Sequence, residues 1–264
     1  MKNGPIGIFD SGVGGLTVFR EIRRLFPYED IVYFGDTARL PYGTKSPETI
    51  VRFALKNINF LKNHDVKVIV IACNTASAVL LNLKKKFRIP VINVIEPGAR
   101  QALLFSRNKK IGVIGTESTI QSRAYEKALR RYNPSAKIFT RACPLFVPLI
   151  EEDWVKKPET KFIVKRYLSA LKATGIDALI LGCTHYPLLK PLIQKEIGRE
   201  VKLIDSAREV AKELDEVLKT KRLPLKEKGL PRDRFFVSDL PPKFRKIGER
   251  FLGRKLGKIQ LHRL

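Results

Sequence analysis

Two short apolar runs, each ending in a cysteine motif, constrain the fold of this chain more than any other feature. Residues 66–71 precede Ala72-Cys73-Asn74-Thr75, and residues 178–181 precede Gly182-Cys183-Thr184-His185. Apolar runs of this length, rich in Val, Ile and Leu, are typical of buried parallel strands. Open α/β sheets place their functional groups at the carboxyl ends of such strands. We therefore predict that the two cysteines face one substrate from opposite sides.

The rest of the first half alternates strands with helical stretches, as in a parallel sheet with crossover helices. The predicted strands cover Ile6–Asp10, Ile31–Phe34, Val68–Ala72, Val91–Val94 and Lys110–Ile114. The predicted helices cover Leu16–Leu25, Pro47–His64, Ala76–Phe87 and Pro97–Ser106.

The pattern then starts again. Ile111-Gly112-Val113-Ile114 echoes Ile6-Gly7-Ile8-Phe9, an offset of 112 − 7 = 105 residues, and the two motif cysteines are 183 − 73 = 110 residues apart. Similar offsets over strand–turn–helix units indicate internal duplication. We expect an α/β protein of two similar lobes with mostly parallel sheets, related by a pseudo-twofold duplication, with the active site in the cleft between them.

The expected domain organisation is discontinuous. Residues 1–97 and 208–264 would form the first lobe, carrying Cys73, and residues 98–207 the second, carrying Cys183. The second lobe would end with a strand at Val201–Ile204. A helix at Ala207–Leu218 and a basic tail would then return to the first lobe, where residues 235–237 suggest a further strand.

The net charge of +25 is unusual, and much of it lies late in the chain. Residues 219–264 contain 15 Lys and Arg against 4 Asp and Glu, which is 11 of the 25 excess charges. Such a segment can be a nucleic-acid or anionic-surface patch, or simply a solvated basic face. None of the common nucleic-acid-binding motifs is present, which favours the solvated face. A nucleic-acid contact remains the non-enzyme alternative.

The numbers and spacing of cysteines and histidines bear on disulfides, metal sites and cellular location. Three cysteines give no disulfide framework, and three dispersed histidines without Cys-x-x-Cys or His-x-x-x-His spacing predict no metal site. No apolar stretch approaches the roughly 20 residues that span a bilayer. The amino terminus runs directly into a strand, so we expect no signal peptide, a cytoplasmic location and no membrane contact.

The first loop, from Asp10 and Ser11 to Gly15, looks at first like a dinucleotide-binding turn, with Asp36 near the place of a ribose-binding acid. The match fails because Thr17 occupies the third glycine position, and because the Asp10 carboxylate would repel a pyrophosphate. Glycines here would instead let backbone amides approach a small anionic ligand. Asp10 could then orient a catalytic group or receive a substrate ammonium, or it could simply cap a tight turn.

Each cysteine motif combines a thiol with carboxylate-binding groups. Strand-to-helix turns favour a thiolate through backbone amides and the helix dipole. Asn74 and Thr75 in one motif, and Thr184 and His185 in the other, are suited to holding a carboxylate. His185 is also a candidate proton partner for Cys183.

Two further pairs of residues are open to more than one interpretation. Glu151 and Glu152 are surface charges, or one of them is the acidic partner of His185. Tyr42 and Gly43 form an ordinary turn, or their amides and the Tyr42 hydroxyl close over a small substrate. Cys143 lacks the setting of the other two cysteines, and we expect it to be structural.

Taken together, these motifs resemble the glutamate racemase family over nearly the whole chain. The resemblance is carried by residues 7–16, 35–39, 41–43, 72–77, 94–98, 142–149 and 181–188. It implies a cofactor-independent isomerase that interconverts L- and D-glutamate and supplies D-glutamate for peptidoglycan, and that is commonly a homodimer. Runner-up activities within the same superfamily are aspartate and hydantoin racemisation.

The resemblance also assigns roles to residues. It implies that Cys73 deprotonates D-glutamate with the support of Asp10, and that Cys183 deprotonates L-glutamate with the support of His185 and Glu151. The substrate contacts it implies are Asp10, Ser11, Tyr42, Gly43, Asn74, Thr75, Thr184 and His185, with Thr116 and Thr119 as further candidates.

Overall fold

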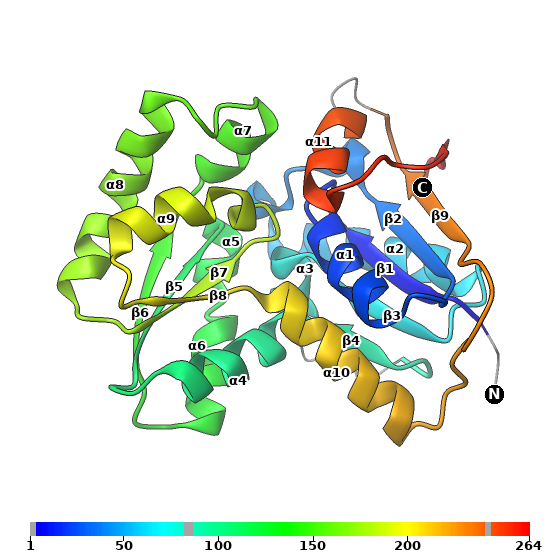
Figure 1. Cartoon of the computed structure of the whole chain (residues 1–264), viewed down its shortest axis with the longest axis horizontal. Helices are drawn as coiled ribbons and strands as arrows, with labels where there is room; N and C mark the ends of the chain where they lie inside the picture. Colours follow the sequence, from blue (N-terminus) through cyan, green and yellow to red (C-terminus); the bar gives the residue numbers. More distant parts are fainter. Residues whose placement is uncertain (1–3, 82–86, 241–243) are drawn as a thin grey trace.

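A computed structural model of the chain describes residues 4–81, 87–240 and 244–264. Two separate parallel sheets, each with helices packed on it, form two lobes (Figure 1). The first lobe is built on a six-stranded sheet with the order β10-β9-β2-β1-β3-β4. The second lobe is built on a four-stranded sheet with the order β6-β5-β7-β8.

The strands of the first lobe come from both ends of the chain. They are β1 (Ile6–Asp10), β2 (Ile31–Gly35), β3 (Val68–Ile71), β4 (Val91–Asn93), β9 (Asp233–Val237) and β10 (Ile259–Leu261). The strands of the second lobe are β5 (Lys110–Gly115), β6 (Lys137–Ala142), β7 (Ala178–Gly182) and β8 (Lys202–Ile204). Every pairing between these strands is parallel.

The two sheets share one topology. The order β2-β1-β3-β4 in the first lobe matches β6-β5-β7-β8 in the second. Cys73 follows β3 and Cys183 follows β7, which are equivalent strands in this comparison. The expected α/β fold of two similar, mostly parallel lobes is confirmed.

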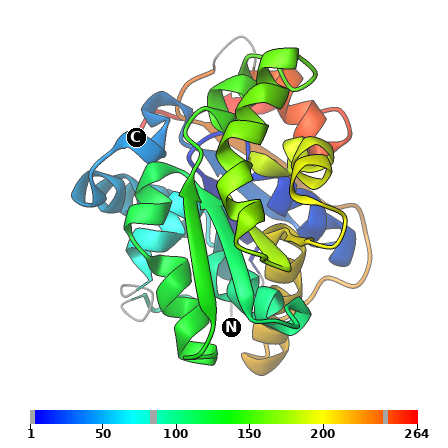
Figure 2. The same ribbon diagram turned by 90° about the vertical axis from the view of Figure 1, so that its left-hand side faces the viewer.

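Helices cover both sheets, which is why the central strands are apolar along their whole length. The first lobe carries α1 (Leu16–Leu25), α2 (Pro47–Lys62), α3 (Asn74–Leu80), α11 (Phe244–Leu252) and the short turns η1 (Thr37–Arg39) and η2 (Tyr42–Thr44). The second carries α4 (Ile95–Phe105), α5 (Glu117–Gln121), α6 (Ala124–Tyr132), α7 (Phe146–Glu151), α8 (Pro158–Ala173), η4 (Tyr186–Leu189) and α9 (Lys190–Ile197). Figure 2, in which the second lobe faces the viewer, shows helices on both sides of its sheet.

One long helix joins the lobes. α10 (Ser206–Thr220) follows β8 of the second lobe and packs against both α1 and α4 (Figure 1). The chain then returns to the first lobe and adds β9 beside β2. Both the predicted helix at 207–218 and the suggested strand at 235–237 are therefore confirmed.

Most predicted boundaries agree with the structure to within three residues. The helix predicted from Ala76 begins at Asn74, because the Cys73 side chain caps it by accepting a hydrogen bond from the backbone N–H of Ala76. It ends at Leu80, and its predicted continuation through 82–86 lies outside the described residues. The helix predicted from Pro97 begins at Ile95, because Asn93 Oδ1 accepts from the N–H groups of Ile95 and Glu96.

The basic carboxyl-terminal segment packs on the protein itself and forms several ion pairs there. Arg254 lies 2.8 Å from Asp233. From α11, Arg250 reaches across to the second lobe and lies 2.6 Å from Asp153. In the described part of the chain, no helix is both long and apolar enough to cross a bilayer.

Candidate active site

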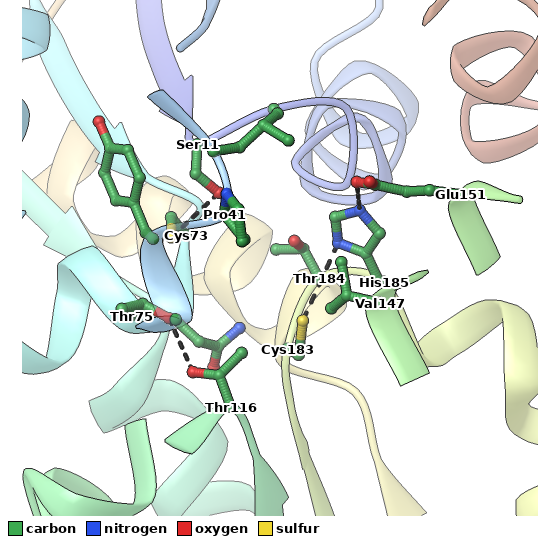
Figure 3. Close-up of a pocket in the computed structure, with 15 residues that line it drawn as sticks. Ser11, Pro41, Cys73, Thr75, Thr116, Val147, Glu151, Cys183, Thr184 and His185 are labelled. Carbon is green, nitrogen blue, oxygen red and sulfur yellow. Dashed lines mark hydrogen bonds and ion pairs between the residues drawn. The ribbon is translucent and has the colours of Figure 1, made fainter. Parts of the chain in front are cut away.

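A narrow cavity lies between the lobes at the carboxyl ends of β1, β3, β5 and β7 (Figure 3). It holds about 30 Å³ of space for water-sized molecules. Its walls are formed by Ser11, Gly12, Leu40, Pro41, Tyr42, Gly43, Cys73, Asn74, Thr75, Thr116, Val147, Glu151, Cys183, Thr184 and His185. Both motif cysteines therefore reach one cavity, one from each lobe.

Cys73 lies at the first turn of α3, and its side chain is almost completely buried. Its sulfur accepts from the Ala76 N–H at 3.4 Å and donates to the Ser11 hydroxyl at 3.6 Å. Burial, together with the negative charge of nearby Asp10, raises the pKa of the Cys73 thiol to about 12, although the bonds to Ala76 and Ser11 act in the opposite direction. Cys73 is therefore a neutral thiol at physiological pH.

Cys183 belongs to a row of three functional groups. Its sulfur lies 3.9 Å from His185 Nδ1, and His185 Nε2 lies 2.9 Å from Glu151 Oε1. Burial disfavours a charged imidazole, but the hydrogen bonds to Cys183 and Glu151 outweigh burial and raise the pKa of His185 to about 10. His185 is therefore an imidazolium at neutral pH, and its charge is opposite to that of a Cys183 thiolate.

The structure distinguishes between the two candidate acids next to α7. Glu151, the last residue of α7, reaches His185, while Glu152 is exposed and absent from the cavity wall. Asp10 is fully buried at the end of β1, where it accepts from the Gly12 N–H at 3.0 Å and from the Thr184 hydroxyl at 3.4 Å. Burial raises the pKa of Asp10, and the charge of His185 opposes that shift.

The glycine-rich first loop touches the second lobe. A Cβ atom at Gly14 would lie 2.3 Å from Thr184 Oγ1 and 2.6 Å from His185 Nδ1. No real side-chain carbon can approach that closely. Glycine is therefore required at position 14 for the two lobes to meet at the cavity.

Threonine hydroxyls from both lobes form a polar group at the cavity. Thr75 Oγ1 lies 3.0 Å from Thr116 Oγ1 (Figure 3). Thr119 Oγ1 lies 3.3 Å from Thr75 Oγ1 and 3.0 Å from Thr116 Oγ1. Each hydroxyl can both donate and accept, so the group can reorganise to hold an anion. Thr119 contacts this group without lining the cavity itself.

The Tyr42 hydroxyl is engaged away from the sulfurs. It donates to Asp36, which is fully buried, and accepts from Asn57 Nδ2 at 3.0 Å. Asp36, considered above as a ribose-binding acid, also accepts from the Ser238 hydroxyl at 2.8 Å. Because the Tyr42 hydroxyl is already hydrogen-bonded, only the backbone of Tyr42 and Gly43 can contact a ligand in the cavity.

Sequence reasoning missed several apolar wall residues. Leu40, Pro41 and Val147 line the cavity, and Phe251 of α11 packs its ring edge-on to His185 with the ring centroids 5.3 Å apart. Phe251 lies 66 positions from His185 in the chain, and no local pattern signals that contact. Within the described ranges, no group of three His, Cys, Asp or Glu side chains could hold a metal ion.

Known proteins resemble this chain in both sequence and fold. The family model for Asp/Glu/hydantoin racemases matches residues 6–214. A glutamate racemase from Geobacter metallireducens is 54% identical over 257 residues, covering 96% of this chain and 94% of the relative. This chain belongs to the glutamate racemase family.

Solved structures of the glutamate racemase family share the whole fold. Glutamate racemase isoform RacE1 from Bacillus anthracis superposes with a TM-score of 0.93 at 44% identity, covering 100% of this chain and 98% of that one. The enzyme from Francisella tularensis, solved in complex with D-glutamate, gives 0.93 at 42% identity and covers 99% and 98%. An aspartate racemase homologue from Pyrococcus horikoshii, at 19% identity and a TM-score of 0.57, shares the fold alone.

Proposed function

We propose that this protein interconverts L- and D-glutamate by a two-base proton transfer between Cys73 and Cys183. The observation that carries the proposal is the placement of two cysteines from equivalent turns of two lobes in one small cavity. Membership of the glutamate racemase family, and the D-glutamate complex of the Francisella relative, support glutamate as the substrate.

In the L-to-D direction, Cys183 begins as the base. Protonated His185, held by Glu151, stabilises a thiolate on Cys183 through its opposite charge. The thiolate removes the proton from Cα, the Cα–H bond breaks, and the electron pair stays on the substrate, shared with the α-carboxylate. Cys73, a thiol before reaction, then donates its proton to Cα from the opposite face.

The reverse direction exchanges these roles. Cys73 removes the proton from D-glutamate and Cys183 returns one, so Cys73 must first lose its own proton in the substrate complex. Asp10, whose pKa is raised by burial, lies near Cys73 and is the proposed acceptor of that proton. Neither direction needs a cofactor.

The carbanionic transition state also needs stabilisation, because the α-proton is a very weak acid. We assign this to donors that line the cavity: Asn74 and Thr184 at the two cysteine turns, Ser11 in the first loop and the backbone of Gly43. The three clustered hydroxyls of Thr75, Thr116 and Thr119 are the proposed site for the side-chain carboxylate of glutamate. His185 and Tyr42 complete the proposed substrate contacts.

Three organisational features belong to the same proposal. The domains would comprise residues 1–97 plus 208–264, and residues 98–207, a division supported by the strands in each sheet. The product D-glutamate would serve peptidoglycan synthesis in the cytoplasm. Homodimerisation belongs to the proposal because the family resemblance implies it. Sedimentation velocity at micromolar concentration tests it, since a monomer under those conditions would refute it.

The activity is tested by incubating reduced, metal-stripped protein with D-glutamate in D₂O. Circular dichroism follows the optical activity, and NMR follows the α-proton. The proposal expects the ellipticity to decay to zero while deuterium enters Cα. If neither signal moves for glutamate but both move for aspartate, the substrate assignment is wrong. If neither substrate reacts while the protein is folded, the racemase function itself is wrong.

A further inference from the structure

Asn74 is the first of three buried polar side chains that form a hydrogen-bonded row across three helices. Tyr125 of α6 places its hydroxyl 2.6 Å from Asn74 Oδ1. The same hydroxyl lies 3.3 Å from the Oγ of Ser206, the first residue of α10. This hydrogen-bonded row therefore connects α3, which follows Cys73, with α6 of the second lobe and with α10, which joins the lobes.

The length of the first hydrogen bond gives its direction, and that in turn gives the direction of the second. A separation of 2.6 Å is normal for O–H···O and shorter than the usual range for N–H···O. The Tyr125 hydroxyl therefore donates to the amide oxygen of Asn74 rather than accepting from its NH₂ group. Because the phenol has only one proton and donates it to Asn74, the Ser206 hydroxyl must donate to the Tyr125 oxygen. Each hydrogen bond therefore points toward Asn74.

This direction determines which end of the Asn74 amide meets the cavity. Asn74 is 4% exposed and lines the cavity beside Cys73. Its oxygen is held by Tyr125, and among the described residues no hydrogen bond takes up its Nδ2 atom. The two N–H groups are thus the part of the amide left for a bound molecule.

The surrounding backbone allows little freedom to this hydrogen-bonded row. A Cβ atom at Gly182 would come within 3.2 Å of the Tyr125 ring, and one at Gly98 within 2.6 Å of Ser206 Oγ. Tyr125 itself is 2% exposed. The phenol and the serine hydroxyl are therefore held by packing as well as by their mutual contact.

We propose that Tyr125 is a positioning residue that fixes the Asn74 amide with its N–H donors facing the substrate. The inference rests on the proposed racemase function. When Cα loses its proton, negative charge grows on the α-carboxylate, and a donor already aligned stabilises that charge without reorganisation. Without Tyr125 the amide can rotate and present its oxygen, which would repel the same carboxylate.

The test compares two phenol-to-phenyl changes on one helix. Tyr125→Phe removes only the hydroxyl that holds Asn74, whereas Tyr132→Phe removes an exposed hydroxyl at the end of α6. We expect kcat/KM for glutamate to fall about 10- to 100-fold in both directions for Tyr125→Phe, mainly through kcat. Tyr132→Phe should match the wild type. Wild-type kcat/KM in Tyr125→Phe would overturn the inference.

A double-mutant comparison separates positioning from a general structural effect. If Tyr125 acts through Asn74, adding Tyr125→Phe to Asn74→Ala should change kcat/KM less than about 2-fold. An undiminished loss in that background would overturn the inference. Ser206→Ala, which removes the donor to Tyr125, should cause a smaller loss in the same direction and provides the test if Tyr125→Phe does not fold.

An NMR readout keeps the inference separate from the racemase proposal. In protein labelled with ¹⁵N-asparagine, the side-chain NH₂ signals of Asn74 are identified by their absence in Asn74→Ala. They should shift in Tyr125→Phe and stay in place in Tyr132→Phe, without any substrate present. If the wild type fails to racemise glutamate, the proposed function is wrong. If the wild type is active but the Asn74 signals do not move, only the role of Tyr125 is wrong.

Discussion

His185 is joined to Glu151 by a hydrogen bond of 2.9 Å between Nε2 and Oε1, and this contact connects the Cys183 turn after β7 with the end of α7. It explains why a buried imidazole can remain charged. Burial alone would lower the pKa of His185, but the bonds to Cys183 and Glu151 raise it from 6.5 to about 10. The elevated pKa has consequences for both activity and stability.

The first prediction concerns pH. Because the folded pKa lies above the unfolded value, the stabilisation from His185 is complete below pH 6.5 and disappears as the pH rises through about 10. The kcat/KM for L-glutamate should fall over the same upper range, as the imidazolium that supports a Cys183 thiolate is lost. Glu151→Gln removes one of the two interactions that raise the pKa, so this alkaline limb should move to lower pH.

Racemisation assays by circular dichroism from pH 7 to 11 measure the fall of kcat/KM at alkaline pH. Glu152→Gln is the matched control, since Glu152 is the neighbouring carboxylate and does not line the cavity. An alkaline limb that stays in place in Glu151→Gln would show that Glu151 does not control the charge of His185.

The second prediction concerns Gly14. Gly14→Ala would place a methyl group 2.3 Å from Thr184 Oγ1, so the first loop and the second cysteine turn must separate. Misplacement of reacting groups by about 1 Å can cost about 100-fold in rate, and we expect a loss of at least that size in kcat/KM. Gly257→Ala is the control, because nothing lies within 4 Å of its added carbon. Full activity in folded Gly14→Ala would contradict the close approach of the lobes.

The sequence predicted the central strands and the two cysteine turns because those signals are local. Apolar runs such as Val68–Ile71 need no long-range information, and the cysteine motif directly after the run marks the turn. The pairing of His185 with one of two acids stayed open at that level. The sequence offers two adjacent glutamates and no way to choose between them. The choice depends on where α7 ends, because its last residue, Glu151, faces the imidazole and Glu152 does not.

Contacts across the lobes were beyond local reasoning. Phe251 against His185 and Tyr125 behind Asn74 each join elements far apart in the chain, and neither residue stands out in its own segment. The basic tail shows a related difficulty. Its charge count favoured a solvated basic face and left a polyanion-binding patch open, but it could not predict that Arg250 and Arg254 pair with Asp153 and Asp233 of the same chain.

The third prediction separates the three cysteines. Cys73→Ala and Cys183→Ala should each abolish racemisation, because inversion needs a proton taken from one face and returned to the other. Cys143 is fully buried, and its thiol donates to the carbonyl of Arg141 at 3.7 Å, away from the cavity. Cys143→Ala should keep kcat within about 2-fold of the wild type and lose about 1 to 2 kcal/mol of unfolding free energy.

Racemisation is measured by circular dichroism and stability by urea unfolding. Appreciable racemisation by either Cys73→Ala or Cys183→Ala would be incompatible with a two-base mechanism. Loss of activity in well-folded Cys143→Ala would give Cys143 a role that its position does not suggest.

The last prediction concerns a buried ion pair that holds the carboxyl-terminal return to the first lobe. Lys67 Nζ lies 2.8 Å from Glu29 Oε2, and both side chains are at most 4% exposed. Lys67 also donates to the Pro224 carbonyl at 2.5 Å, and Glu29 Oε1 accepts from the backbone N–H of Lys226 at 2.6 Å. Removing one charge leaves the other buried without its partner, which typically costs about 3 to 5 kcal/mol. We expect that loss of unfolding free energy for Glu29→Gln.

Urea unfolding of a small variant set tests this prediction. Glu21→Gln is the matched control, because Glu21 pairs only loosely, at 3.6 and 3.8 Å, with the exposed Arg20 and Arg24. Its cost should be below about 0.5 kcal/mol. Glu29→Gln combined with Lys67→Met removes both charges and should recover part of the loss, since no buried charge is then left unpaired. Lys67→Met is measured alone as well. If the losses of unfolding free energy in the two single variants simply add up in the double variant, Glu29 and Lys67 do not act as a pair. The hydrogen bonds to Pro224 and Lys226 would then hold this segment instead.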